Sequence, residues 1–172
     1  MSRIPYPDPD KLSEAKRAIL FSGAPVLNLS RMAMHAADPL WAAYRNFAIA
    51  ARDHAPLDDM LRELVILRVA YLSNSEYEVF HHRHVAVSAG ASEVQLEAVR
   101  SGNLNLLDER ERAAIAFTGE LVEDVAPSDA ALSAVLAHFT VEEVFGISIL
   151  IAGYMTTARL IGIGGIEPES EG

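Results

Sequence analysis

Apolar residues recur along most of this chain at the three- to four-residue spacing of amphipathic helices, and no stretch alternates polar and apolar residues as strands do. We therefore predict an all-α fold. Residues typical of helix starts and stops, mainly serine, threonine, aspartate, proline and glycine, divide the pattern into segments. The predicted helices cover residues 10–20, 27–37, 38–50, 56–72, 75–89, 92–101, 108–125, 127 onward and 140–161.

Short polar motifs locate several helix starts more closely. A capping box pairs a serine, threonine or aspartate with an acidic or amide side chain three residues later. Four predicted helices open with this motif: Ser75-x-x-Glu78, Ser92-x-x-Gln95, Asp108-x-x-Glu111 and Thr140-x-x-Glu143. Asp38 followed by Pro39 opens another, with proline in the first turn. The apolar face predicted for that helix consists of Leu40, Ala43, Phe47 and Ala50.

The length of 172 residues fits a single domain, which at this size buries about 70% of the surface of its unfolded chain. Three prolines within residues 1–9 predict an extended arm, and a neighbouring subunit is one place for it to lie. The acidic end of the chain, residues 165–172, is predicted to be a mobile tail.

The last predicted helix is apolar on nearly every side between residues 144 and 155. This run is too short for a membrane span, which needs about 20 apolar residues. A helix of this kind belongs in a core or a subunit interface. Gly146, Ala152 and Gly153 would let another helix approach closely. We therefore predict a homo-oligomer, a trimer or a hexamer.

Composition excludes several classes of function. The chain has no cysteine, which removes disulfides, thiolate metal sites and thiol catalysis. Its net charge of −10 argues against binding nucleic acid or an anionic membrane through bulk charge. The first ten residues lack the apolar run of a signal peptide. We expect a cytoplasmic protein with a small-molecule substrate.

Two predicted helices meet across a very short break at Ser73 and Asn74, so they should form an antiparallel hairpin. Counting outward from the break places Glu63 within about one helical turn, ~5.4 Å, of His82. Glu78 and His82 are four residues apart and share a helix face. We therefore predict that Glu63, Glu78 and His82 converge between the two helices. Such a shared, partly buried site shifts pKa values toward the working pH.

Two runs in this hairpin carry a resemblance to known proteins: Arg62-Glu63-Leu64-x-x-Leu67-Arg68-Val69-Ala70 and Tyr77-Glu78-x-x-x-His82-x-x-x-Ala86-x-x-x-Gly90. They resemble the carboxymuconolactone decarboxylase and alkyl hydroperoxidase D superfamily. The resemblance is specific over the hairpin and looser over residues 25–165, and it implies an all-helical, oligomeric protein. In the peroxidase branch of that superfamily, a Cys-x-x-Cys pair stands where this chain has Ser75 and Glu78, so the resemblance points to a cysteine-free branch.

Each of the three converging residues also has a purely structural interpretation. Glu78 can complete the capping box with Ser75. His82 can be a core histidine with satisfied hydrogen bonds. Glu63 can be a buried carboxylate paired with Arg62, Arg68 or His82, since buried carboxylates are rare unless paired.

No metal site is predicted, although His81 and His84 flank His82. Glu78-x-x-His81 has the spacing used in di-iron bundles, but such a site needs a second copy of the motif, and the chain has none. Residues 81, 82 and 84 also point in different directions on a helix.

The function that the resemblance implies is a cofactor-free lyase or related enzyme acting on a small lactone, keto acid or other carbonyl compound. Decarboxylation of a β-carbonyl acid leaves an enolate that must be protonated. In this interpretation His82 supplies the proton, Glu63 holds and polarises the imidazole, and Glu78 completes the catalytic group.

The substrate-binding residues expected for this reaction are Arg68, Tyr77 and Arg83, with either Arg68 or Arg83 holding the leaving carboxylate. Tyr154 and Arg159, near the end of the last helix, are further candidates, although Arg159 could equally pair with an acid at an interface. Two alternatives stay open. One is a peroxidase-related protein without thiol activity, and the other is a non-catalytic helical oligomer that binds a ligand or a partner.

Overall fold

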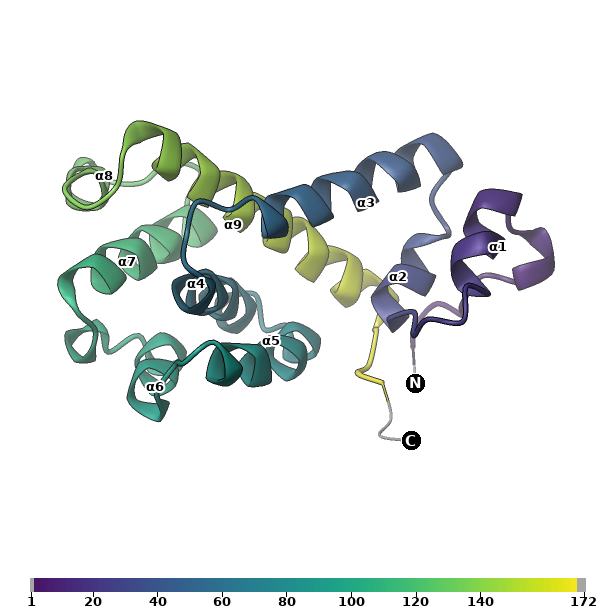
Figure 1. Cartoon of the computed structure of the whole chain (residues 1–172), viewed down its shortest axis with the longest axis horizontal. Helices are drawn as coiled ribbons and strands as arrows, with labels where there is room; N and C mark the ends of the chain where they lie inside the picture. Colours follow the sequence, from purple (N-terminus) through teal and green to yellow (C-terminus); the bar gives the residue numbers. More distant parts are fainter. Residues whose placement is uncertain (1, 170–172) are drawn as a thin grey trace.

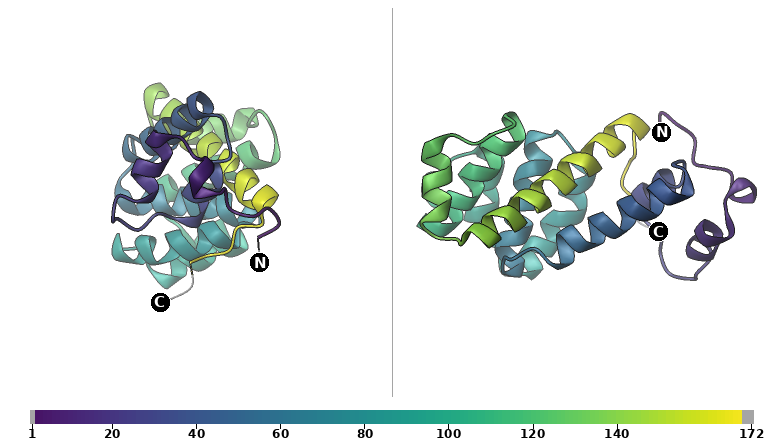
Figure 2. Two further views of the ribbon diagram at one scale, coloured as in Figure 1. Left: turned by 90° about the vertical axis from the view of Figure 1, so that its right-hand side faces the viewer. Right: turned by 90° about the horizontal axis from the view of Figure 1, so that it is seen from above.

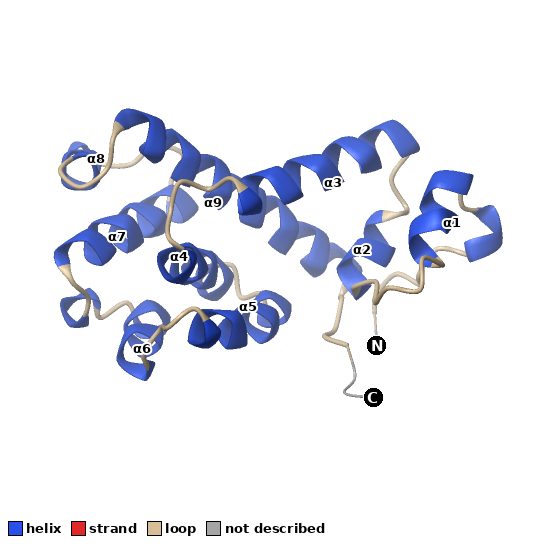
Figure 3. Cartoon of the chain, in the orientation of Figure 1, coloured by secondary structure: helices blue, strands red, loops and turns tan. Residues whose placement is uncertain are grey.

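The computed structural model describes residues 2–169, and every regular element in this range is a helix (Figure 1, Figure 3). The prediction of an all-α fold is confirmed. Two short 3-10 helices, Pro9–Lys11 and Leu104–Leu106, precede α1 and α7. The α-helices are α1 (Glu14–Leu20), α2 (Asn28–Ala33), α3 (Asp38–Asp53), α4 (Asp59–Leu72), α5 (Glu76–Ser88), α6 (Glu93–Ser101), α7 (Glu109–Glu123), α8 (Asp129–Leu136) and α9 (Val141–Gly164).

Helix α4 forms the centre of the core and packs against α5, α6, α7 and α9 (Figure 1). Its sequence is apolar on most faces, and Leu61, Leu64 and Val65 have no exposed surface. A helix buried on nearly every side offers little access to water, so a charged residue on it must find partners inside the protein. Glu63, which is 2% exposed, is in that position.

Helix α9 crosses the molecule and packs against α7 and α8 toward its start, against α4, and against α2 and α3 toward its end (Figure 2). Its glycines allow close contacts within the same chain. A Cβ atom at Gly146 would lie 2.5 Å from Cδ of Pro56, in the loop before α4. One at Gly153 would lie 3.4 Å from Cβ of Ala51 on α3. The close helix approach expected at Gly153 is therefore made by α3.

One side of α9 is exposed and apolar. Phe145, Ile149 and Ile163 are 67%, 49% and 64% exposed. A subunit contact would cover such a stripe, and the homo-oligomer stays a prediction. By length and composition alone, with a mean hydropathy of 1.6, α9 could also cross a membrane. In the 18-residue stretch that meets this criterion, 44% is buried inside the protein. Core helices meet the same criterion.

The N-terminal arm lies on its own chain rather than requiring a neighbouring subunit. The backbone N–H of Arg3 donates to the carbonyl of Gly164 at 2.8 Å. A ring nitrogen of His35 lies 2.8 Å from the carbonyl of Pro5, and the guanidinium of Arg31 stacks over the ring of Tyr6. The arm therefore joins α2 to the end of α9. Residue 1 lies outside the described residues.

The chain after α9 is also held in place, which the prediction of a mobile tail did not anticipate. Ile166 is 6% exposed and packs with Met32, Tyr77 and Ile161. The amide of the Asn28 side chain donates to the carbonyl of Glu167 at 3.1 Å. Residues 166–169 thus contact the helices around them, while the mobility of the tail stays a prediction, and its last part, residues 170–172, lies outside the described residues.

Helix α3 turns a different side toward the protein from the one its pattern predicts. All four residues of the predicted apolar face are classed as exposed, with Leu40 at 65% and Phe47 at 41%. Trp41 and Ala51 are the buried residues of α3. Because α3 packs mainly on α9 and not into the central core, one narrow side is covered.

The helix starts follow local chemistry more closely. The capping boxes at Ser92, Asp108 and Thr140 are all present. At α3 the N-cap is Ala37, so Asp38 is the first helical residue, with Pro39 beside it in the first turn.

We predict opposite effects from two glycine-to-alanine substitutions in α9. The added methyl group of Gly146→Ala would overlap the ring of Pro56 and should lower the free energy of unfolding by about 1–3 kcal/mol. The added methyl group of Gly162→Ala meets no atom of the described residues within 4 Å and should raise the free energy of unfolding by about 0.5–1 kcal/mol. Urea denaturation followed by circular dichroism measures both. Equal effects in the two variants would contradict the contact between α9 and Pro56.

Candidate active site

The turn between α4 and α5 is built around Asn74, the only non-glycine residue in the described part of the chain with a positive φ, at 52°. Its N–H donates to the carbonyl of Tyr71, and the N–H of Ser75 donates to the carbonyl of Ala70. These two bonds form a Schellman motif, which ends a helix and reverses the chain. The predicted antiparallel hairpin is therefore present, with its register set by the turn.

The hairpin brings Glu63 and His82 into direct contact. Nδ1 of His82 lies 2.7 Å from Oε2 of Glu63. On the other edge of the ring, Nε2 lies 3.3 Å from Oε2 of Glu78. One carboxylate comes from α4 and the other from α5, so the imidazole lies between two acids. The three residues predicted to converge are thus in one place.

Arg62 partly balances the negative charge of this group. Its Nε and Nη2 each lie 3.3 Å from Oε1 of Glu63, and its Nη1 lies 2.7 Å from Oδ1 of Asp59. Both oxygens of the Glu63 carboxylate are therefore used, one by Arg62 and one by His82. Of the three partners considered for Glu63, the structure supplies these two.

The capping box predicted for Ser75 and Glu78 is wrong. Ser75 is the N-cap residue of α5, but its side chain makes no capping hydrogen bond, and its buried Oγ has no hydrogen-bond partner among residues 2–169. The Glu78 side chain, 5% exposed, instead contacts His82 one turn along the helix. The acid at this position therefore belongs to the central group of side chains.

The two carboxylates decide the charge of His82. Burial lowers the pKa of the imidazole, but the hydrogen bonds to Glu63 and Glu78 and the charges of these acids raise it by more than burial lowers it, to about 9. His82 is therefore an imidazolium at neutral pH, with a proton on each ring nitrogen. Nδ1 and Nε2 both donate to the flanking acids.

Tyr154 on α9 completes the immediate surroundings of His82. The two rings meet edge to face, with their centres 5.1 Å apart. Burial raises the pKa of the Tyr154 phenol, and the charges of Glu78 and Glu63 raise it further, far above its usual value. The phenol stays protonated at any physiological pH and can donate a hydrogen bond.

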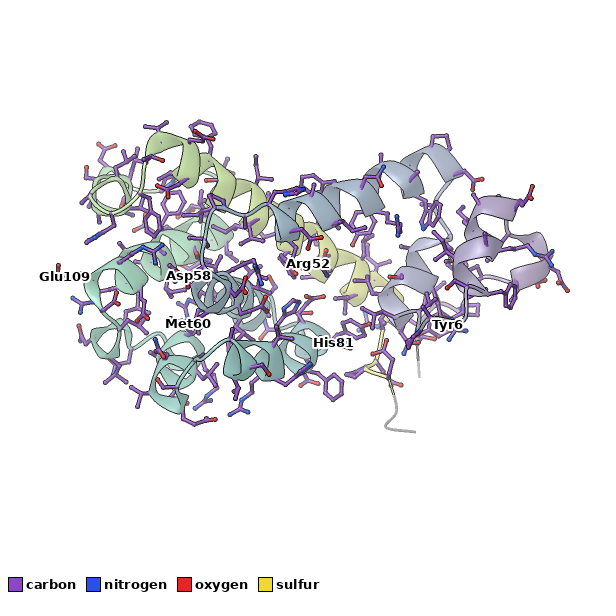
Figure 4. The ribbon with its side chains drawn as sticks, viewed as in Figure 1. Tyr6, Arg52, Asp58, Met60, His81 and Glu109 are labelled. Atoms are coloured by element: carbon purple, nitrogen blue, oxygen red, sulfur yellow. The ribbon has the colours of Figure 1, made fainter. Side chains whose placement is uncertain are left out.

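A cavity of about 660 Å³ opens beside this group. Glu78, His82 and Tyr154 line it on one side. The opposite wall comes from α1, α2, α3 and the loop between α1 and α2, and is largely apolar, with Arg45 and Arg52 as its cationic residues. Arg52 lies at the end of α3, next to α9 (Figure 4). A cavity of this size can hold a small organic molecule.

Comparison with known proteins agrees with this geometry. Residues 36–120 match the model of the carboxymuconolactone decarboxylase family, a stretch that contains α3 to α6 and most of α7. The match supports the resemblance to the carboxymuconolactone decarboxylase family over this stretch, and the fold is that of alkyl hydroperoxidase D-like proteins. The resemblance of the hairpin residues is confirmed. A search of curated proteins found no match to this chain.

Solved structures show how widely the superfamily fold is shared. A peroxidase-related protein from Ralstonia eutropha JMP134, with an alkylhydroperoxidase AhpD core, has a TM-score of 0.81 at 19% identity, covering 98% of this chain and 93% of its own. A peroxidase-related protein from Silicibacter sp. TM1040 has a TM-score of 0.75 at 15% identity, covering 97% and 88%. The debrominase Bmp8 has a TM-score of 0.70 at 16% identity, covering 83% and 77%.

Other residues predicted for a superfamily site lie elsewhere. Arg68 extends between α6 and α7, where its Nη1 donates to the carbonyl of Val99 at 3.0 Å. Arg83 is at the surface and pairs with Glu93 at 2.7 Å. Neither lines the cavity, so neither is placed to hold a substrate carboxylate there.

Tyr77 does line the cavity, and its hydroxyl donates to Glu169 at 2.9 Å. Arg159 is exposed, donates to the carbonyl of Met155 and does not line the cavity. The arginines that do line it, Arg45 and Arg52, were not predicted, because a surface arginine on an amphipathic helix gives no signal in the sequence.

The neighbouring histidines do not join His82. His81 turns toward Glu169, with its Nε2 2.7 Å from Oε2 of the acid, and His84 is exposed, with its Nδ1 near the carbonyl of Phe80. Within residues 2–169 no three histidine, aspartate or glutamate side chains are arranged as a metal site.

We predict that His82 makes part of the stability depend on pH. Folding raises the pKa of His82 from 6.5 to about 9, so its stabilisation is complete below pH 6.5 and is lost as the pH rises through 9. Denaturation at intervals across this window measures the slope. In His82→Gln this part of the slope should disappear. A slope that is the same in both proteins would contradict the raised pKa.

Proposed function

We propose that this protein is a cofactor-free lyase that acts on a small keto acid, lactone or related carbonyl compound by acid–base chemistry. The observation that carries the proposal is an imidazolium, His82, held between Glu63 and Glu78 on the wall of a 660 Å³ cavity. The matching family is described as carboxymuconolactone decarboxylase, which supports the reaction class.

Loss of carbon dioxide from a β-keto acid leaves the electron pair of the broken bond on the α-carbon, as an enolate. One proton completes the product, and His82 supplies it. Of its two hydrogen bonds, the one to Glu63 is shorter, 2.7 Å against 3.3 Å to Glu78. Glu63 therefore fixes the ring, while the proton on Nε2, beside Glu78, is the one transferred. Solvent then returns a proton to the imidazole.

Two other features suit the same chemistry. The neutral phenol of Tyr154 can donate a hydrogen bond to the enolate oxygen as negative charge develops there. Arg45 and Arg52 lie at the cavity wall, where Arg52 is paired with Asp53 at 2.7 Å, and Arg45 adds positive charge that attracts an acidic substrate despite the net charge of −10 of the chain.

The size of the ligand proposed for this cavity has further support from a protein of similar fold. A variant of the debrominase Bmp8, with a cysteine changed to alanine, has been solved in complex with 2,3,4-tribromopyrrole, and its TM-score to this chain is 0.69. That ligand is a small, planar, largely apolar ring. We infer a ligand of similar size for this cavity, but no thiol step, because the chain has no cysteine.

A non-catalytic ligand-binding protein is the second candidate. Complete pairing of Glu63 with Arg62 and His82 favours it, because a fully satisfied group can serve stability alone. The two candidates differ in whether His82 exchanges its proton with a bound molecule.

The deciding experiment follows β-keto acids and small lactones by NMR in deuterated water, looking for loss of carbon dioxide and deuterium in the product. We expect turnover by the native protein and a decrease of about 10²–10⁴-fold in His82→Gln and in Glu63→Gln. His84→Gln, an exposed histidine of the same helix, is the matched control and should keep full activity.

Turnover that survives in His82→Gln would refute the acid–base role. If the same variant is inactive but also loses several degrees of melting temperature, Glu63→Gln separates the two effects, since glutamine keeps the shape of the side chain. Binding of these compounds without any turnover would favour the second candidate.

A further inference from the structure

The last described residue places a carboxylate against two residues of the cavity wall. Oε1 of Glu169 accepts hydrogen bonds from the Tyr77 hydroxyl at 2.9 Å and from the backbone N–H of Asn28 at 2.6 Å. Its Oε2 lies 2.7 Å from Nε2 of His81. Two hydrogen-bond donors and one imidazole nitrogen at ion-pair distance therefore surround a carboxylate that comes from the far end of the chain.

These contacts are buried rather than incidental. Tyr77 is 3% exposed, and neither Nε2 of His81 nor Oε2 of Glu169 is accessible to solvent. The rings of Tyr77 and His81 lie against each other with their centres 4.5 Å apart. Burial raises the pKa of the Glu169 carboxyl, but the hydrogen bonds from Asn28 and Tyr77 and the charge of His81 lower it below its usual value. The donors thus form a site for an ionised carboxylate.

The same residues face the proposed reaction site. Tyr77 and His81 line the cavity together with Glu78 and His82. Tyr77 and His81 are four residues apart on α5, as are Glu78 and His82, so each pair lies along one face of the helix. The second pair is displaced by one residue from the first, so the two pairs lie side by side. A molecule bound through a carboxylate at Tyr77 and His81 therefore extends toward the imidazolium of His82. Figure 4 shows His81 at the side of α5 where the chain ends.

The segment that carries Glu169 is anchored before it reaches the site. Ile166 is buried, and its N–H donates to the carbonyl of Ile161 at 3.1 Å. The anchor keeps Glu169 near Tyr77, His81 and Asn28. Glu169 acts as an internal ligand at high effective concentration.

We propose that Tyr77, His81 and the backbone N–H of Asn28 form a carboxylate-binding site for the substrate, which Glu169 occupies until a ligand displaces it. The proposal rests on the proposed function for its substrate class. Hydrogen bonds to a carboxylate stabilise the charge that decarboxylation would remove, so the site suits a carboxylate that the product retains. Because Glu169 competes, the apparent affinity of the native protein for acids is reduced by the fraction of sites it leaves open.

Isothermal titration of the full chain with benzoate, and with benzamide as its uncharged match, tests this competition. We expect Glu169→Ala to bind benzoate about tenfold more tightly than the native protein, with no change for benzamide. Glu169→Gln, which keeps the shape of the side chain, should show a smaller gain. Glu97→Ala removes an exposed carboxylate that pairs with Arg100 and should leave both affinities unchanged.

A second substitution shows where the benzoate binds. Tyr77→Phe added to Glu169→Ala removes one donor and should cancel most of the gain. An unchanged benzoate affinity in Glu169→Ala, an equal gain for benzamide, or a gain that survives Tyr77→Phe would each overturn the proposal. Because binding is measured without turnover, the result is separate from the test of lyase activity.

Discussion

The buried carboxylate of Glu63 is the constraint on which both the hairpin and the site depend. A carboxylate inside a protein is unfavourable by several kcal/mol unless charges and hydrogen bonds compensate it. Arg62 lies beside it on α4, but the partner at 2.7 Å, His82, belongs to α5. Compensation therefore requires that the two helices pack in one register. The Schellman turn at Asn74 sets the same register from the other end, so local geometry and buried charge agree.

Glu78 gives this hairpin its particular chemistry. With His82 protonated, Arg62 and His82 balance Glu63 and Glu78, and the four side chains are neutral together. The neutral form of His82 would leave one uncompensated negative charge in a buried place, so the two carboxylates favour the protonated imidazole. The peroxidase branch that the hairpin resembles has thiols at positions 75 and 78. In this chain a hydroxyl and a carboxylate occupy these positions, and the carboxylate lies 3.3 Å from His82.

The features predictable from the sequence are those determined by residues close together in the chain. The capping boxes at Ser92, Asp108 and Thr140 depend on neighbours three residues apart, and the contact of Glu63 with His82 follows from the shortness of one turn. The failures have distant causes. Among the described residues the Oγ atom of Ser75 has no hydrogen-bond partner, because the Glu78 side chain contacts His82 instead. His82 is held in turn by Glu63 on another helix, α4.

The exposed side of α3 was not predicted, and neither were the contacts of residues 166–169, for the same reason. Periodicity identifies an apolar face but not how much of it a neighbouring helix covers, and α3 meets only a narrow contact on α9. The hydrogen bond from Asn28 to Glu169 joins residues 141 positions apart, and no sequence pattern near either residue predicts it. Arg68 likewise matches the pattern of the hairpin while its side chain extends to Val99, away from the cavity.

The two sides of the cavity come from two different parts of the chain, and these parts can change independently. The acid–base residues come from the hairpin, inside the stretch that matches the family, whereas much of the opposite wall comes from residues 18–34, which lie before that stretch. Substitutions in residues 18–34 can alter the shape and polarity of the cavity without changing Glu63, Glu78 or His82. Proteins with the same hairpin can thus differ in the molecules they bind, and residues 18–34, rather than the shared helices, are the part to compare when their ligands are sought.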